Sequence, residues 1–164
     1  MTREGVMEAA TVMLGENNAN RMVLLRHDLP DGSSHFDWLI QRSRGGPDAP
    51  GATPDLDARC LLSIRVSGEF PFRPGQRAAA EQIADHRGLY LDYEGPVSGD
   101  RGRVERVARG IGAIMAENAD LVVIDGRFAA VEGGVGLADS LARWELDKAD
   151  GTLRATGRAG PCRE

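Results

Sequence analysis

The stretch RHDLPDGSSHFDWLIQ, residues 26–41, is the most informative part of this sequence. The residues just before it, RMVLLR (21–26), are apolar and β-prone, and its second half, SHFDWLIQ (34–41), alternates polar and apolar side chains. The segment between them, DLPDGSS, consists of residues that favour turns. This pattern predicts a β-hairpin, with His27 and His35 at the two ends of its loop and close enough to meet across the strands.

The predicted hairpin brings together three side chains that can bind a metal. His35 and Asp37 are two residues apart and therefore share one face of the second strand. Phe36 and Trp38 point to the opposite face, toward the core. With His27, the first pair offers two imidazoles and a carboxylate, a ligand set suited to Zn²⁺ or Mn²⁺. The alternative is that both histidines are hydrogen-bonded residues without a metal, because no compact ligand motif of the HExxH kind is present.

Length and composition indicate one domain. The 164 residues are enough for a sizeable core, and 21 glycines and 8 prolines indicate many turns. No apolar run reaches the roughly 18 residues of a transmembrane helix, and the N-terminus lacks the pattern of a secretory signal. Cys60 and Cys162 form no CxxC pair. We expect a cytoplasmic protein that does not associate with membranes, and a monomer.

The charge of the chain limits its partners. A net charge of −5 argues against a protein that coats nucleic acid non-specifically, but it leaves room for a local phosphate site. The chain has one lysine, Lys148, among its 20 basic residues, so arginine supplies nearly all its positive charge. Arginine suits bidentate phosphate contacts. The base composition of the genome is the alternative explanation of this bias, and the one we favour.

Short apolar runs separated by turn signals predict a mainly β fold, a small closed antiparallel β-barrel or a sandwich, with one or two short helices. We expect an N-terminal helix or extension (1–20), a barrel domain (21–157) and a flexible tail (158–164). Beyond the hairpin, strands are expected at 60–67, 89–94, 103–107, 120–125, 127–131, 140–147 and 152–156, and an exposed loop at 42–58. Helices are expected at 4–15 and at 76–85, with helical alternatives for 110–118 and the segment that starts at 136.

A second stretch, DHRGLYLDYEGPVSGDRGRV (85–104), holds His86, the third of the three histidines. Together the two stretches resemble the 3′-phosphoesterase domain of bacterial DNA ligase D, the multifunctional end-joining ligase. That domain carries the motifs KH-x-A-x-x-LH-Y-D-F-R-L-E and EDHP-x-x-Y-x-x-FEG-x-IP-x-G-x-YG. The matching residues are Arg26-His27, His35-Phe36-Asp37-Trp38, Asp85-His86, Tyr90 and Tyr93-Glu94-Gly95. The resemblance covers residues 21–110, and all three histidines fall on motif positions.

The resemblance implies a β-barrel with a divalent metal on one side, Mn²⁺ in the first place, with Zn²⁺ or another divalent metal as the alternative. His27, His35 and Asp37 would bind the metal, and His86 and Tyr90 would contact the scissile phosphate. The implied reaction removes a 3′-phosphate or a 3′-terminal ribonucleoside from DNA or RNA–DNA ends, in DNA repair and non-homologous end joining. The implied partners are these 3′ ends and end-joining ligase or polymerase proteins.

The chain departs from the family pattern where the family binds phosphate. Leu39 stands in place of an arginine, on the same strand face as Asp37, and Ala78 stands in place of a second arginine. Losing two guanidinium groups would weaken phosphate binding unless other cations replace them. The candidates for this role are Arg26, Arg77 and Arg101.

The sequence therefore leaves three functions open. The first is a metal-dependent phosphoesterase, with the chain as a stand-alone relative of the ligase domain. The second is a catalytically silent barrel that binds a metal or nucleic-acid ends as a repair accessory module. The third is a scaffold that keeps the fold without a metal.

Overall fold

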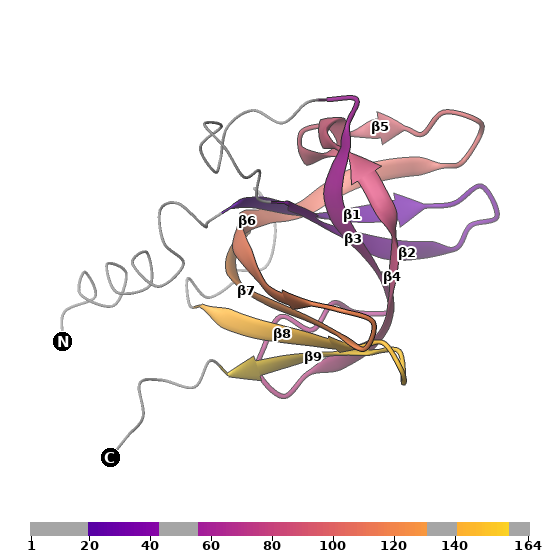
Figure 1. Ribbon diagram of the computed structural model, residues 1–164. Coiled ribbons are helices and arrows are strands. Elements are labelled where there is room, and N and C mark those ends of the chain that lie inside the picture. The colour runs from indigo at the N-terminus through magenta and orange to yellow at the C-terminus, as the bar shows by residue number, and fades with distance from the viewer. Residues whose placement is uncertain (1–19, 43–55, 131–140, 158–164) are drawn as a thin grey trace, which may run out of the picture.

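The structure is a computed structural model that describes residues 20–42, 56–130 and 141–157 (Figure 1). The described residues are almost entirely β-strand, which confirms the predicted mainly β fold. The strands are β1 (Asn20–Asp28), β2 (Ser34–Gln41), β3 (Arg59–Ser67), β4 (Arg77–Arg87), β5 (Gly95–Pro96), β6 (Arg103–Glu117), β7 (Leu121–Ala130), β8 (Ala142–Asp147) and β9 (Thr152–Gly157), and the 3-10 helix η1 spans Gly88–Leu91.

The strands pair into a closed ring. Their order is β1-β2-β3-β4-β9-β8-β7-β6-β5, and an additional pairing of β1 with β6 closes eight of them, with β5 attached to β6 outside the ring. All the pairings are antiparallel. Figure 1 shows this barrel-like arrangement, with η1 and β5 on the side of β1, β2 and β3. Strand β1 is paired along both of its edges, with β2 on one side and β6 on the other.

The hairpin forms as predicted. In the register of β1 and β2, His27 lies opposite His35, and Asp28 lies opposite Ser34. Gly32 has a φ of 89°, a left-handed conformation that glycine adopts without steric cost, at the tip of the loop. The hairpin therefore fixes the two histidines as cross-strand neighbours.

The main core fills the inside of the ring. Alternate residues from all eight ring strands point inward, among them Met22, Trp38, Leu62, Ala80, Ala108, Val122, Trp144 and Leu153. The centre of this core is aromatic: the ring of Trp38 lies 5.2 Å from that of Trp144 and 5.3 Å from that of Phe70, both in edge-to-face geometry. The prediction that Phe36 and Trp38 point to the core is confirmed, since Trp38 is fully buried there and Phe36 packs against it.

A second apolar group, the outer cluster, lies on the opposite face of β1, β2 and β3. It consists of Val23, Leu25, Leu39, Leu61, Leu91, Val97 and Val104. Leu91 belongs to η1, and Val97 follows β5, so these two elements cover the outer face of the sheet. The strands around the hairpin are therefore buried on both faces. Side chains such as Asp37, which share the face of Leu39, are removed from water as a result.

Two sequence-based predictions are wrong. The helix expected at 76–85 does not form: residues 77–85 belong to strand β4, which pairs with β3 along most of its length and with β9 at its start. Its alanines suit a helix, but Ala78 and Ala80 point into the core, and burial outweighs local propensity. Residues 89–94 do not form a strand: the chain turns through η1, and both Asp92 and Tyr93 donate backbone hydrogen bonds to Leu89.

The C-terminal strands agree with the sequence and resolve its alternatives. Residues 110–117 continue strand β6 and are not helical, and the two strands expected at 120–131 form one strand, β7. Gly110 permits this pairing, since a Cβ there would lie 2.0 Å from the Arg127 carbonyl oxygen. The expected N-terminal helix, the C-terminal tail, most of the loop 42–58 and the start of the segment from 136 lie outside the described residues.

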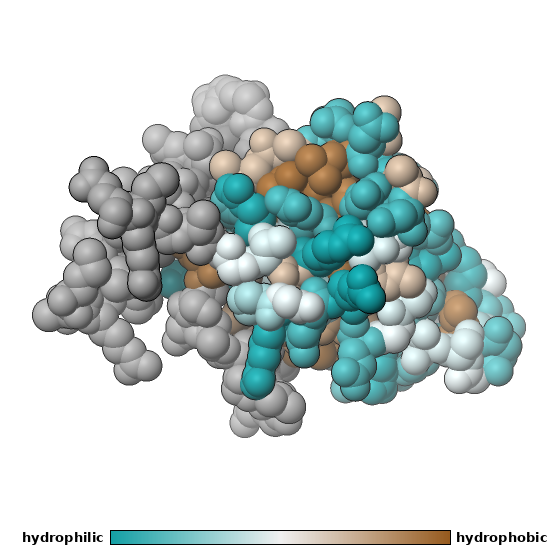
Figure 2. All heavy atoms as spheres, turned by 90° about the horizontal axis from the view of Figure 1, so that it is seen from below, coloured by the Kyte–Doolittle hydropathy of each residue, from teal (hydrophilic) through white to brown (hydrophobic). Residues whose placement is uncertain are grey.

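On the face that Figure 2 shows, hydrophilic residues cover most of the described surface, and hydrophobic residues appear between them. Among the described residues, no helix has the length and hydrophobicity needed to cross a membrane.

Candidate metal and anion site

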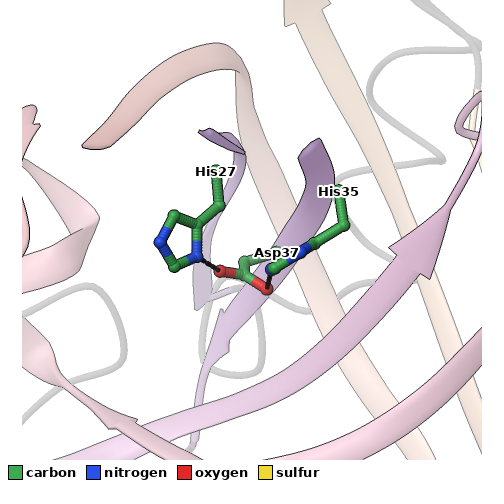
Figure 3. A group of neighbouring side chains, drawn as sticks. All are labelled: His27, His35 and Asp37. Carbon is green, nitrogen blue, oxygen red and sulfur yellow. Dashed lines mark ion pairs between the residues drawn. The ribbon is translucent and has the colours of Figure 1, made fainter. Parts of the chain in front are cut away.

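The structure brings His27, His35 and Asp37 together at the end of the hairpin. Nδ1 of His27 lies 3.3 Å from one carboxylate oxygen of Asp37, and Nε2 of His35 lies 3.2 Å from the other. The carboxylate thus sits between the two imidazoles, as Figure 3 shows. One ligand atom from each residue lies within 4.8 Å of the others, so the group can hold a metal ion.

Two buried atoms of this group fit a metal particularly well. His35 Nε2 and Asp37 Oδ1 are buried and have no hydrogen-bond partner among the described residues. Buried polar atoms are normally paired, so a buried nitrogen and a buried carboxylate oxygen that face each other without hydrogen bonds are suited to a bound cation or a shared proton. Two ligands bound to one metal at about 2.1 Å lie roughly 3.0–3.4 Å apart, the range in which these atoms already lie.

The tautomer of His27 also favours a metal. Its Nε2 lies 2.7 Å from the backbone carbonyl oxygen of Arg101 and must donate the hydrogen, because a carbonyl oxygen only accepts. In the neutral ring, Nδ1 then carries a lone pair, which faces the Asp37 carboxylate. Two electron-rich atoms at this distance repel each other unless a cation or a proton lies between them. Such an outer hydrogen bond is the usual way in which proteins orient a metal-binding histidine.

The carbonyl of Arg101 is held by the glycine-rich turn of the second sequence stretch. Val97 donates a backbone hydrogen bond of 2.8 Å to Gly102, which closes the turn. Gly102 has a φ of 93°, and a Cβ there would lie 1.9 Å from the backbone oxygen of Asp28. The turn therefore approaches the end of β1 as closely as a backbone can, and only glycine permits it.

His86 and Tyr90 line the same cleft as the three candidate ligands, which confirms that the fold brings both sequence stretches together. The cleft has a volume of about 700 Å³. His86 donates Nδ1–H to the carbonyl of Ala84 over 3.2 Å, which leaves Nε2 as the free nitrogen of the neutral ring. Tyr90 packs edge to face on His86, with ring centroids 5.6 Å apart.

Burial keeps two of these histidines neutral. Desolvation lowers the pKa of His35, and the nearby Asp37 carboxylate only partly offsets this effect. Desolvation likewise lowers the pKa of His86, with Asp37 again acting in the opposite direction. Both imidazoles therefore present a lone pair near neutral pH, which is the form that binds a metal or accepts a proton.

Four arginines line the cleft: Arg59, Arg65, Arg87 and Arg101. The cleft has a single carboxylate, that of Asp37, among its described lining residues. A protein with a net charge of −5 thus has a cleft with a local excess of positive charge. Guanidinium groups around a metal site are suited to an anionic ligand such as a phosphate.

Arg65 is the residue that sequence reasoning missed. It lies on β3 directly opposite Asp37 in the strand register. Its Nε is buried without a hydrogen-bond partner in the described structure, and its ion pair with Glu81 is long, at 3.7 Å. The one available signal was that Arg65 is the only charged residue within the apolar run 60–67.

The three predicted phosphate contacts have different outcomes. Arg101 lines the cleft, although its guanidinium also donates to Ser98. Arg26 lies outside the cleft lining and pairs with two carboxylates, those of Asp28 and Glu105, at 3.3 and 3.1 Å. Arg77 also lies outside it, at the start of β4, nine residues before His86, where β4 meets β9. The structure therefore places neither of these two arginines in the lining of the cleft.

Leu39 does lie on the site face, as its spacing from Asp37 predicts. It is fully buried in the outer cluster, beneath the cleft. A leucine fits this position because the apolar residues from η1 and β6 cover it. The positive charge comes from the neighbouring strand instead, through Arg65.

No protein-family model matches this chain, and a search of the curated proteins finds no match either. The interpretation of the site therefore depends on its own geometry and on the motifs of the sequence.

Proposed function

We propose that this protein is a metal-dependent phosphoesterase that removes a 3′-phosphate or a 3′-terminal ribonucleoside from nucleic-acid ends, in cytoplasmic DNA repair and end joining. The observation that carries the proposal is the convergence, in one cleft, of a three-residue metal group with four arginines and a neutral histidine. A metal group alone suits many functions, and an arginine cleft alone suits any anion. Their combination suits a phosphate ester.

The metal would be held by His27, His35 and Asp37, through the atoms that already face one another. Two imidazoles and one carboxylate suit Mn²⁺ and Zn²⁺ alike. When bound, such an ion polarises a phosphate oxygen and lowers the pKa of a water molecule. A set of three protein ligands leaves positions open for both.

The arginines of the cleft would bind the phosphate. Arg65 stands across from Asp37 with an unpaired Nε, so it can donate to a phosphate oxygen beside the metal group. Arg59 and Arg101 line the same cleft and add positive charge. Charge-assisted contacts of this kind position the ester and stabilise the extra negative charge of its transition state.

His86 can act as a general base. Its Nδ1–H is committed to Ala84, so Nε2 of the neutral ring can accept a proton from the attacking water. Donation from Nε2 to a leaving oxygen would follow after that protonation. Tyr90 lines the cleft, and its hydroxyl can donate a hydrogen bond to the phosphate without a change of charge.

The experiment that tests this proposal has two steps. Metal binding is first measured by titration calorimetry with Mn²⁺ and with Zn²⁺. Cleavage is then measured on a primer–template that ends in a 3′-phosphate or in a single 3′-ribonucleotide, with and without the metal. The parent protein should trim only with metal, and Asp37→Ala should lose both binding and trimming.

Asp28→Ala is the matched control, because Asp28 is an acidic residue of the same hairpin that lies outside the cleft lining. It should keep both activities. Protein that holds metal without trimming either end would overturn the enzyme and favour a silent module that binds a metal or nucleic-acid ends. Protein that binds neither metal would overturn the phosphoesterase and the metal-binding module, and only a module that binds nucleic-acid ends without a metal would remain.

A further inference from the structure

A second group of arginines lies outside the cleft. Arg21, Arg106, Arg109 and Arg127 line a recess of about 440 Å³, whose rim also includes Leu91 and Asp92. Tyr90, the residue before Leu91, lines the cleft described above. The recess and the cleft are therefore close neighbours around η1.

The strand register explains why these arginines gather. Arg21 of β1 lies opposite Ile111 of β6, which lies opposite Arg127 of β7. Two residues along β6, Arg109 lies between Val23 of β1 and Ala129 of β7. Arg109 is thus diagonal to both Arg21 and Arg127. Because residues two apart on a strand share a face, three guanidinium groups from three strands lie on one outer face of the ring.

The described acidic residues do not balance this charge. Asp92 accepts two hydrogen bonds from Arg21, one of them at 3.1 Å, and Glu94 lies 3.8 Å from Arg106. The guanidinium groups of Arg109 and Arg127 also line the recess, and neither forms a side-chain hydrogen bond or an ion pair with another described residue. The Nε of Arg106 is buried and also lacks a hydrogen-bond partner in the described part of the chain.

Such an arrangement is unfavourable without an anion. Like charges on neighbouring strands destabilise a sheet, and a buried donor without an acceptor costs free energy. An anionic ligand in the recess would remove both penalties, because planar guanidinium groups match phosphate oxygens. The lining of the recess comes from three strands, so it has the extent to contact more than one phosphate.

We propose that this recess binds backbone phosphates of the nucleic acid whose 3′ end occupies the cleft. The proposal rests on the function proposed above. His27 and Arg21 share the outer face of β1 and lie six residues apart, which corresponds to roughly 20 Å of strand. A nucleic-acid duplex advances about 3.4 Å per nucleotide, so the recess would hold phosphates about five to seven nucleotides from the 3′ end.

The test compares two ligands with the same 3′-phosphate end: a hairpin duplex of twelve base pairs and a dinucleotide too short to reach the recess. The variant is the double substitution Arg109→Ala/Arg127→Ala. The matched control is Arg77→Ala/Arg154→Ala, because these two arginines also lie opposite each other on neighbouring strands but line neither the cleft nor the recess. Binding is measured by fluorescence anisotropy at several salt concentrations.

The parent should bind the hairpin more tightly than the dinucleotide, and the variant should reduce this advantage about 10-fold or more. The slope of log K against log salt should fall by about 2 for the hairpin, since two phosphate contacts are lost. Equal losses in the control, an unchanged salt slope, or a parent that shows no preference for the hairpin would overturn the proposal. A parent that prefers the hairpin but trims neither end would disprove the phosphoesterase alone. The double variant would then still test whether the recess binds phosphates.

Discussion

His27 donates the Nε2–H of its imidazole to the backbone carbonyl of Arg101, a residue 74 positions later in the chain, over 2.7 Å. This bond joins the hairpin to the glycine-rich turn and leaves Nδ1 of His27 directed at Asp37. The orientation of one candidate metal ligand therefore depends on the backbone of a different sequence stretch. The turn acts on the site through its main chain, whichever side chain residue 101 carries.

Gly102→Ala should disrupt this connection. The added Cβ would lie 1.9 Å from the Asp28 backbone oxygen, so the turn must move away from β1. We expect a loss of about 2–4 kcal/mol in the free energy of unfolding. Gly99→Ala is the control: Gly99 also has a positive φ, of 76°, but the nearest atom to its Cβ would be 3.7 Å away. Denaturant unfolding measures the cost, and nitrogen chemical shifts of His27 report its tautomer. Equal losses in the two variants would show that the close approach is unimportant.

Arg65→Gln should weaken phosphate binding while the metal group stays intact. Removing a guanidinium that stands opposite Asp37 takes away a charge-assisted donor in the cleft. We expect kcat/KM for a 3′-phosphate end to fall about 100-fold, or the affinity for that end to fall comparably in a protein without turnover. Mn²⁺ titration of the same variant checks the metal group. Arg77→Gln, outside the cleft, should change neither quantity, and a matching loss in that control would contradict the assignment.

The two tryptophans of the core should respond differently to replacement by phenylalanine. Trp144 donates its Nε1–H to the carbonyl of Pro71 over 2.8 Å, while the buried Nε1 of Trp38 has no partner among the described residues. Both replacements reduce packing, but only Trp144→Phe leaves an acceptor without its donor. We expect Trp144→Phe to cost about 1–2 kcal/mol more than Trp38→Phe. Urea unfolding of the two variants measures the difference in the free energy of unfolding. A larger loss in Trp38→Phe would show that lost packing outweighs the lost hydrogen bond.

Arg42 should control the acid stability of the fold. It donates to Asp85 over 2.6 Å and to Glu117, and its hydrogen bonds with Glu117 hold the pKa of that carboxyl at about 2 instead of its usual 4.5. A lowered pKa in the folded state stabilises the protein above pH 4.5, and this stabilisation is lost as the pH falls toward 2. Arg42→Met should therefore lower stability at pH 7 by about 1–2 kcal/mol and weaken its decline below pH 4.5.

Unfolding midpoints between pH 2 and pH 7 test this prediction. Arg26→Met is the control, because Arg26 also contacts two carboxylates but is more exposed, and exposed ion pairs contribute little. Parallel curves of unfolding midpoint against pH for the parent and Arg42→Met would show that the pKa of the Glu117 carboxyl does not depend on Arg42.

The hairpin and its candidate ligands could be predicted from the sequence because all the necessary information is local. The turn residues and the alternation around them lie within 26–41, and they fix which side chains face each other. The same reasoning failed for β4, where three consecutive alanines favour a helix in isolation. Pairing with β3 supplies the stabilisation that propensity cannot reveal.

The surroundings of the ligands could not be predicted, because they depend on contacts between distant strands. Arg65 reaches the cleft through the register of β2 and β3, and no residue pattern near Asp37 specifies that register. The same holds for the arginine recess, which requires β1, β6 and β7 to align. The motif comparison placed His86 and Tyr90 near the hairpin, and the fold confirms their proximity.

The pairing of β1 with β6 also bears on the order in which the protein assembles. The hairpin can form as soon as its own residues have left the ribosome, but β6 begins at Arg103, so the sheet around β1 closes late. Contacts between residues so far apart in the chain form slowly, because a long loop must first be closed. His27 and His35 are thus exposed to the solvent before the turn that orients them exists. A metal ion captured at that stage would meet a pair of loosely held histidines, and its final coordination would be set only when the second half of the chain folds over it.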